Sequence, residues 1–277
     1  MLSTVSSRSK PGIRWTFLET VSLLAVLMWV VVFWLPALEQ GLARGHGETL
    51  EIDVPTWTFI RRWIQAEEFP LWNPRAALGT PLISAPWGLF YLPALTAFSF
   101  WSIEAIHSRW IVAHVLLGAA GIYTFVRLGG GRPLAATLGA VVYTATGTVV
   151  VAAAAVGFIM PVAWTPWIFV CVEWILKGRH PSALSGAALA AACAAALLGG
   201  QFDITYLIFL ASALFAFFRL VPVLVRRRWP ARQVATLAGA TVAGMLLAAV
   251  LIVPFFEFFQ QSDRLKITYE PGFPRYA

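Results

Sequence analysis

Long apolar runs separated by short polar connections dominate the pattern along this chain. Seven such runs reach or approach the roughly 20 apolar residues that a helix needs to cross the hydrocarbon core of a bilayer. They cover residues 15–38, 109–126, 134–155, 159–176, 182–199, 204–225 and 234–256. The pattern predicts an all-α, polytopic membrane helix bundle of about seven transmembrane helices.

A further apolar run, 85–104, leaves two topologies open. It is nearly long enough to cross a membrane, but it contains Pro86 and Pro93 and ends at Glu104. If it crosses, the connection that holds Arg127 and Arg132 lies outside, and every later connection inverts. If it lies along the membrane surface, all the short basic connections fall on one side.

Loop charges favour the second topology. Of the 20 basic residues, 12 then lie inside, together with only two of the 13 acidic residues, Glu19 and Glu173. The 12 are Arg8, Lys10, Arg14, Arg127, Arg132, Lys177, Arg179, Arg219, Arg226, Arg227, Arg228 and Arg232. Because cytoplasmic loops are enriched in Lys and Arg, we predict a cytoplasmic N-terminus (1–14), a first transmembrane helix (15–38), an outer loop (39–108), a six-helix transmembrane region (109–256) and an outer C-terminal segment (257–277).

Composition agrees with a membrane protein and argues against a nucleic-acid partner. Hydrophobic residues make up 59% of the 277 and charged residues 12%, whereas a soluble domain carries about 25% charged residues. The net charge of +7 arises largely from clusters in short connections, which is typical of cytoplasmic loops and not of a groove that follows phosphates. We therefore expect membrane lipids, and no nucleic acid, as partners.

The first candidate site is acidic and follows the first span. Glu51 and Asp53 precede the amphipathic stretch 57–66, and Pro55 is suited to the first turn of a helix. Asp53 is then either a helix cap or a carboxylate held at the membrane surface as a general base or metal ligand. The spacing does not require a divalent ion, so the metal and any other cofactor stay unassigned.

Three further polar clusters are expected on the same outer face. Asn73 and Arg75 lie in a proline-rich loop and are suited to donate to a phosphate or a sugar. Gln201 and Asp203 follow a Gly-Gly turn between two spans, where they either form a polar turn or line an outward cavity. The remaining candidates for substrate binding are Glu257 and Arg264 at the end of the last span, and His114 inside the second span, where a packed histidine is the simpler interpretation.

Several of these motifs, taken in order, resemble the N-terminal part of the bacterial YfhO-like membrane proteins. The most specific is Phe69-Pro-Leu-Trp-Asn-Pro74, and the similarity covers roughly residues 15–265. The other matching positions are Asp53, Gly79-Thr-Pro81, Phe90-Tyr91-Leu-Pro93, His114 with Gly118 and Gly121, Tyr123 with Arg127-Leu-Gly129, Ala163-Trp164-Thr-Pro166 before Glu173, Gly199-Gly200-Gln201 and Gln261-Ser262-x-Arg264.

This family is grouped with the GT-C-type glycosyltransferases. The resemblance implies a module of seven membrane helices with two juxtamembrane helices in the first outer loop. It also implies transfer of a sugar from a polyprenyl-phosphate carrier to an envelope acceptor, on the outer face of the bacterial cytoplasmic (inner) membrane. The family's catalytic carboxylate lies in the first outer loop, so the resemblance assigns Asp53 as catalytic base, with Glu51 as the reserve candidate.

The chain departs from the family pattern at two places. Gly-Gly-Gln-Phe-Asp stands where relatives often carry a His-Pro pair, which leaves the role of Gln201 open. The chain ends at Ala277, whereas the family usually continues with further spans and an outer domain, so we expect either a fragment with a truncated outer C-terminal segment or a minimal version of the family.

Two other functions remain as alternatives. A transporter or lipid flippase would need charged residues deep inside its spans for ion coupling, and only Glu19, Glu173 and His114 lie in or near them. A non-catalytic scaffold for envelope assembly is the third hypothesis. The sequence specifies neither the sugar and its acceptor nor the oligomeric state.

Overall fold

The computed structural model describes residues 17–40, 49–75, 79–84, 88–154, 156–178, 182–225 and 230–261. Helices account for nearly all of the regular structure in these ranges, and the fold is an all-α membrane helix bundle. The elements are α1 (Phe17–Gln40), η2 (Thr49–Asp53), α2 (Val54–Gln65), β1 (Trp72–Asn73), β2 (Thr80–Pro81), η3 (Leu82–Ser84), α3 (Leu92–Phe100), α4 (Ile103–Leu128), α5 (Pro133–Thr144), α6 (Gly147–Ala152), α7 (Val156–Lys177), α8 (Ser182–Leu198), α9 (Phe202–Val225), α10 (Ala231–Leu247) and α11 (Ala249–Gln261).

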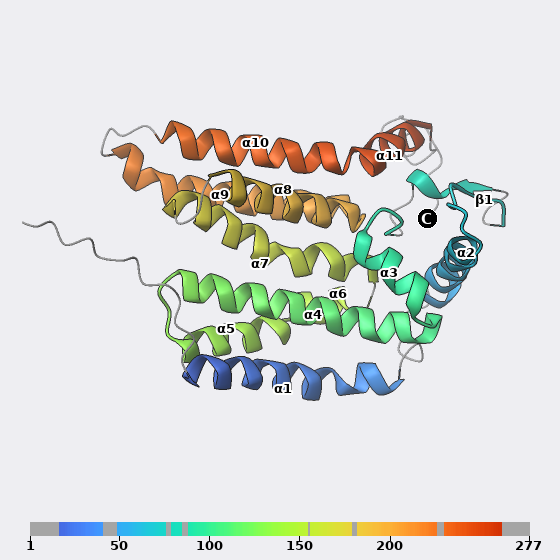
Figure 1. The fold of residues 1–277 in the computed structure, drawn as a ribbon, viewed down its shortest axis with the longest axis horizontal. Helices are drawn as coiled ribbons and strands as arrows, with labels where there is room; N and C mark the ends of the chain where they lie inside the picture. Colours follow the sequence, from blue (N-terminus) through green and yellow to red (C-terminus); the bar gives the residue numbers. More distant parts are fainter. Residues whose placement is uncertain are drawn as a thin grey trace, which may run out of the picture.

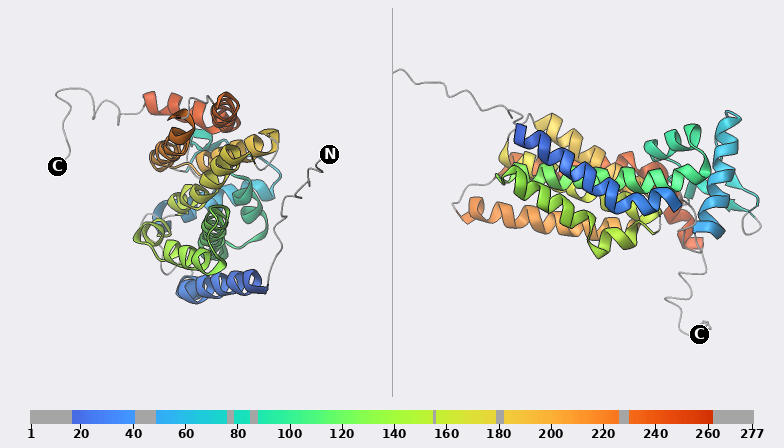
Figure 2. Two further views of the ribbon diagram at one scale, coloured as in Figure 1. Left: turned by 90° about the vertical axis from the view of Figure 1, so that its left-hand side faces the viewer. Right: turned by 90° about the horizontal axis from the view of Figure 1, so that it is seen from below.

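The long helices lie side by side, with α1 and α10 at opposite edges of the bundle (Figures 1 and 2). We call one end of the bundle the basal end: α1, α5, α8 and α10 begin there, and α4, α7 and α9 end there. At the other end, which we call the cap end, α2, β1, α3 and α11 gather (Figure 1). The short elements of the loop 39–108 are therefore grouped over one end of the helices.

Four of the described helices are long and apolar enough to cross a membrane: Phe17–Pro36, Ile103–Leu128, Gly157–Lys177 and Phe202–Pro222. The pair α10 and α11 makes a fifth if it counts as one span, bent by 67° at Ala248. The predicted span 134–155 is split into α5 and α6 around Ala145 and Thr146, and α5 and α8 are shorter apolar helices. The number of such helices thus indicates a multi-pass membrane protein.

The ambiguous run 85–104 forms no single crossing helix. In its described part, from residue 88, Leu92–Phe100 forms α3 and the last two residues already belong to α4. The nine residues of α3 at 1.5 Å each extend about 14 Å, less than half of the hydrocarbon core. Helix α4 then begins at Ile103, six residues before the predicted start at 109. Ser102 explains the earlier start, because its side chain caps the helix by accepting a hydrogen bond from the Ala105 amide at 3.3 Å.

Small residues bring the helices together. A Cβ on Gly118 of α4 would lie 2.8 Å from the Tyr143 ring of α5. A Cβ on Gly121, also in α4, would lie 2.7 Å from Pro166 of α7. Helix α8 is rich in alanine and other small residues, and it packs closely against α10 and against α7. By contrast, most of α1 and α9 is exposed and apolar, as expected of helices that face lipid.

Candidate functional site

Asp53 lies at the cap end, at the junction of η2 and α2. Its backbone is helical (φ −66°, ψ −51°), and its carboxylate makes no capping hydrogen bond to the first turn of α2. The side chain is half-buried, whereas that of Glu51 is exposed. The helix dipole of α2 favours a negative charge at this position. The structure therefore places Asp53 at the start of a helix without giving it the side-chain role of a cap.

Helix α2 is amphipathic and connects this carboxylate to the rest of the cap. Thr56, Trp57 and Ile60 are buried, while the opposite face is exposed. The ring of Trp57 lies 6.5 Å from that of Phe98 in α3. The polar loop after α2 starts with Glu67, whose φ of 60° is unusual for a residue other than glycine. Two short helices, α2 and α3, thus pack together above the membrane helices.

The proline-rich loop forms a short antiparallel ladder, in which Trp72 pairs with Pro81 and Asn73 with Thr80. Asn73 is 5% exposed, and its Oδ1 accepts a hydrogen bond from the Arg75 amide at 3.0 Å. Gly79 is required here, because its φ is 115° and a Cβ would lie 2.5 Å from the Trp72 ring. Asn73 therefore stabilises the turn, and the Arg75 side chain remains exposed.

His114 belongs to a buried hydrogen-bonded chain that joins α3, α4 and α7. Its Nδ1 lies 2.8 Å from the Trp110 carbonyl oxygen, which can only accept, so Nδ1 carries a proton. In the neutral ring Nε2 then accepts from the Tyr91 hydroxyl at 3.0 Å, and that hydroxyl in turn accepts from Trp164 Nε1 at 2.7 Å. Burial raises the pKa of Tyr91 to about 12, which keeps the phenol protonated.

These hydrogen bonds give His114 a structural role. Both of its ring nitrogens contact protein atoms, and its ring packs 4.5 Å from that of Trp110. In this conformation His114 therefore has no free ring nitrogen with which to bind a substrate, the role that was predicted for it. Tyr91 precedes α3 directly, so the chain holds the start of α3 against the bundle.

Gln201 and Asp203 lie beside the same cap. Gln201 Nε2 packs against Gly157 at the start of α7, where an added Cβ would lie 3.1 Å away. Asp203 is exposed in the first turn of α9, and Glu257 is exposed on α11. The rings of Phe202 and Phe255 are 4.5 Å apart, which joins α9 to α11, and α11 packs against η3. The predicted residues in the described ranges thus gather toward the cap end, whereas Arg264 lies outside those ranges.

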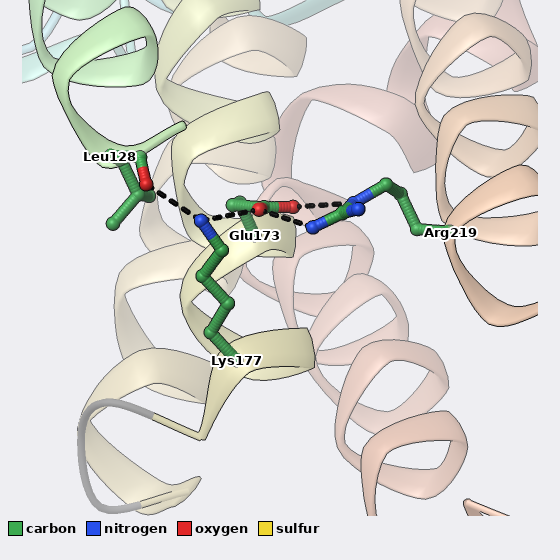
Figure 3. Close-up of polar contacts among 4 residues, drawn as sticks. All are labelled: Leu128, Glu173, Lys177 and Arg219. Carbon is green, nitrogen blue, oxygen red and sulfur yellow. Dashed lines mark hydrogen bonds and ion pairs between the residues drawn. The ribbon is translucent and has the colours of Figure 1, made fainter. Parts of the chain in front are cut away.

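The basal end holds a charge network that the sequence analysis did not anticipate (Figure 3). Glu173 is 4% exposed and accepts from Arg219, with Nε to Oε2 at 3.0 Å and Nη2 to Oε1 at 2.6 Å. Lys177 Nζ lies 2.9 Å from Glu173 Oε1 and donates to the Leu128 carbonyl at 2.6 Å. The network ties α7 to α9 and closes the last turn of α4.

A second buried carboxylate at this end, Glu19 of α1, pairs with Arg127 at the end of α4. Two acidic residues in apolar spans were the available signal for both pairs, because a carboxylate in a membrane helix needs a partner. The sequence does not say which of several arginines provides it.

No protein-family model, curated protein or solved structure matched this chain when it was compared with them. The likeness to YfhO-like proteins therefore rests on the sequence motifs alone. Within the described ranges, no group of three or more His, Cys, Asp or Glu side chains is placed to hold a metal ion.

Proposed function

We propose that this protein is a membrane glycosyltransferase of the GT-C type, which transfers a sugar from a polyprenyl-phosphate carrier to an envelope acceptor. The observation that carries the proposal is the position of Asp53. Asp53 directly precedes α2, the first of the two short helices, and α2 lies at the cap end (Figure 1). This order of elements, a first span followed by two short helices and then the remaining bundle, agrees with the module that the sequence motifs suggested.

The reaction needs one base and one good leaving group. Asp53 would remove the proton from an acceptor hydroxyl while that oxygen attacks the anomeric carbon. The bond from the anomeric carbon to the phosphate oxygen breaks in the same displacement, so the lipid phosphate leaves with the electron pair and the configuration inverts. Exposed Arg75 is suited to bind the phosphate through paired hydrogen bonds, and Arg264 is a second candidate.

The transporter hypothesis has less support. In the described spans the two buried carboxylates are each bonded to basic side chains, Glu19 to Arg127 and Glu173 to Lys177 and Arg219. Carboxylates held in this way are poorly suited to carry a coupling ion, which needs a group that changes its charge or partner during transport. We place the transfer on the outer face of the bacterial cytoplasmic membrane, with the N-terminus inside, on the basis of the loop charges.

A comparison of two carboxylate variants tests the assignment of Asp53. Asp53→Asn keeps the size of the side chain and removes the base, so transfer of labelled sugar by the reconstituted protein should fall by roughly 100-fold or more. Glu51→Gln, two residues away and exposed, should retain most of the activity. Full activity of Asp53→Asn, with loss in Glu51→Gln, would transfer the role to the reserve candidate, and full activity of both would remove the base from this loop.

A further inference from the structure

A small polar cavity opens at the basal end, between the end of α7 and the starts of α8 and α10. Its volume is about 120 Å³, and Ile175 contributes an apolar side to it. The polar and small lining residues are Gly178, Ser182, Ser185, Arg232, Gln233 and Thr236. The helix ends that line the cavity are at the opposite end of the bundle from α2 and the proposed transfer site (Figure 1).

Hydrogen-bond donors converge on this cavity. Arg232 is exposed and uses one N–H to bond Ser182 Oγ at 3.0 Å, which leaves other N–H groups of its planar fork for a ligand. Ser182 accepts that bond and so keeps its own hydroxyl proton for another acceptor. The amide of Gln233 can add further N–H donors. Thr236 is different, since its hydroxyl already donates to the Arg232 carbonyl at 2.8 Å and serves as a wall.

Arg232 also differs from other basic residues at the basal end in its ion pairing. Arg127, Lys177 and Arg219 are each paired with a buried glutamate. In the described part of the chain, Arg232 has no carboxylate within ion-pair distance, and none lines the cavity. The cavity thus combines a positive charge, neutral donors and an absence of competing acidic groups, which is the chemistry that binds phosphate.

We propose that this cavity binds a phosphate group, supplied by an anionic lipid headgroup of the leaflet at the basal end. The helix ends that form it mark the level at which headgroups contact a membrane protein. Basic pockets between membrane helices bind such headgroups in the same way. The site is separate from the proposed transferase chemistry and does not depend on it.

The test measures thermal unfolding of the full chain in nanodiscs of phosphatidylcholine, with or without phosphatidylglycerol as the minor component. Phosphatidylglycerol should raise the unfolding temperature of the wild type, because a ligand that binds only the folded state stabilises it. Arg232→Ala should lose most of that rise. Arg232→Lys should keep only part of it, since lysine retains the charge without the fork.

Two further arms make the result specific. Arg227→Ala removes the same charge from the basic run 226–228 that precedes α10 in the sequence, and it should keep most of the rise. Ser182→Ala keeps Arg232 and should lose part of the rise, which covers the case in which Arg232→Ala fails to fold. Equal losses in Arg227→Ala and Arg232→Ala would reduce the effect to general attraction of charges and overturn the site.

Inorganic phosphate added to phosphatidylcholine discs separates the two sources of the group. No effect of free phosphate, together with a rise in phosphatidylglycerol that depends on Arg232, supports the lipid headgroup. A rise with free phosphate that also depends on Arg232 supports the site but replaces the lipid with a soluble ligand. The proposal is wrong if Arg232→Ala retains the full rise, or if neither addition changes the unfolding temperature of the wild type.

Discussion

Glu173 is a buried carboxylate whose charge is balanced by two cations. Lys177 lies one turn further along the same helix, and Arg219 belongs to α9. Arg219 binds both of its oxygens, and Lys177 binds one of them. Removing one partner leaves the carboxylate with fewer donors in a place that water reaches poorly, which costs more than loss of an exposed pair. The network should therefore contribute to stability even though Arg219 itself is partly exposed.

Arg219→Ala should lower the free energy of unfolding by about 1–3 kcal/mol, the usual cost of losing hydrogen bonds to a buried charge. Thermal unfolding in detergent measures the effect. Arg132→Ala is the matched control, since Arg132 is exposed at the same end of the bundle, and it should change little. Equal unfolding temperatures for Arg219→Ala and the wild type would show that the network adds no stability.

Because of Tyr91, the stability of the protein should depend on pH in the alkaline range. Its pKa is raised by burial from 10.0 to about 12, so the folded protein holds the phenol protonated where the unfolded chain already releases it. The stability that this provides is fully present below pH 10 and is lost as the pH rises toward 12. A difference of two pKa units corresponds to about 3 kcal/mol at most.

The expected result is a decline in unfolding temperature between pH 10 and pH 12 that is steeper in the wild type than in Tyr91→Phe. The phenylalanine variant has no proton to lose there, although it starts from lower stability because the bonds to His114 and Trp164 are gone. Parallel declines of the two proteins would assign the alkaline loss to other groups.

At the scale of elements, two glycines of α10 should respond differently to the same substitution. A Cβ at Gly244 would lie 2.7 Å from the Cβ of Cys193 and 2.8 Å from the Ala190 carbonyl oxygen, both in α8. Nothing lies within 4 Å of a Cβ at Gly239. The first glycine allows close approach of two helices, while the second has no contact to preserve.

Gly244→Ala should therefore lower the free energy of unfolding by about 1–3 kcal/mol, because α8 and α10 must move apart. Gly239→Ala should leave it unchanged or raise it by up to about 1 kcal/mol, the difference in helix propensity. The two variants are compared by thermal unfolding in the same detergent. A similar loss in both would show that propensity and not close packing decides.

Hydropathy was sufficient to place most of the helices, since a bilayer requires long apolar runs whatever the tertiary contacts are. It was insufficient where local or distant groups set the ends. A single hydroxyl, Ser102, starts α4 six residues early, and a bend of 67° at Ala248 divides the last predicted span. Neither feature changes the mean hydropathy, so a window of apolar residues does not detect it.

The candidate site was predictable in location and only partly in roles. Loop charge placed the polar residues together, and the cap end does gather those that are described. Roles depend on individual contacts that a motif does not specify: Asn73 accepts from the Arg75 amide within its own turn, and His114 bonds Tyr91, 23 residues away. For Asp53, the spacing to Pro55 predicted a cap equally well, and only the geometry of its side chain argues against that interpretation.

At the scale of the whole molecule, the two ends of the bundle should face opposite sides of the membrane. Arg75 lies in the cap and Arg132 at the basal start of α5, and both are exposed. A membrane-impermeant maleimide applied from outside should label Arg75→Cys in intact cells, and Arg132→Cys only after permeabilisation. The native Cys171 and Cys193 are buried and should not react. Labelling of both positions from outside would favour the topology in which 85–104 crosses.

The most direct measurement of the proposed function is a time course of labelled sugar in proteoliposomes that contain the purified protein and native polyprenyl-phosphate-linked sugars. A transferase breaks the bond to the lipid phosphate, so the label should leave the lipid fraction and appear on an acceptor with inverted anomeric configuration. Label that crosses the bilayer while still attached to its lipid would indicate a flippase. Label that stays in place on its lipid, with acceptor present, would contradict the transferase.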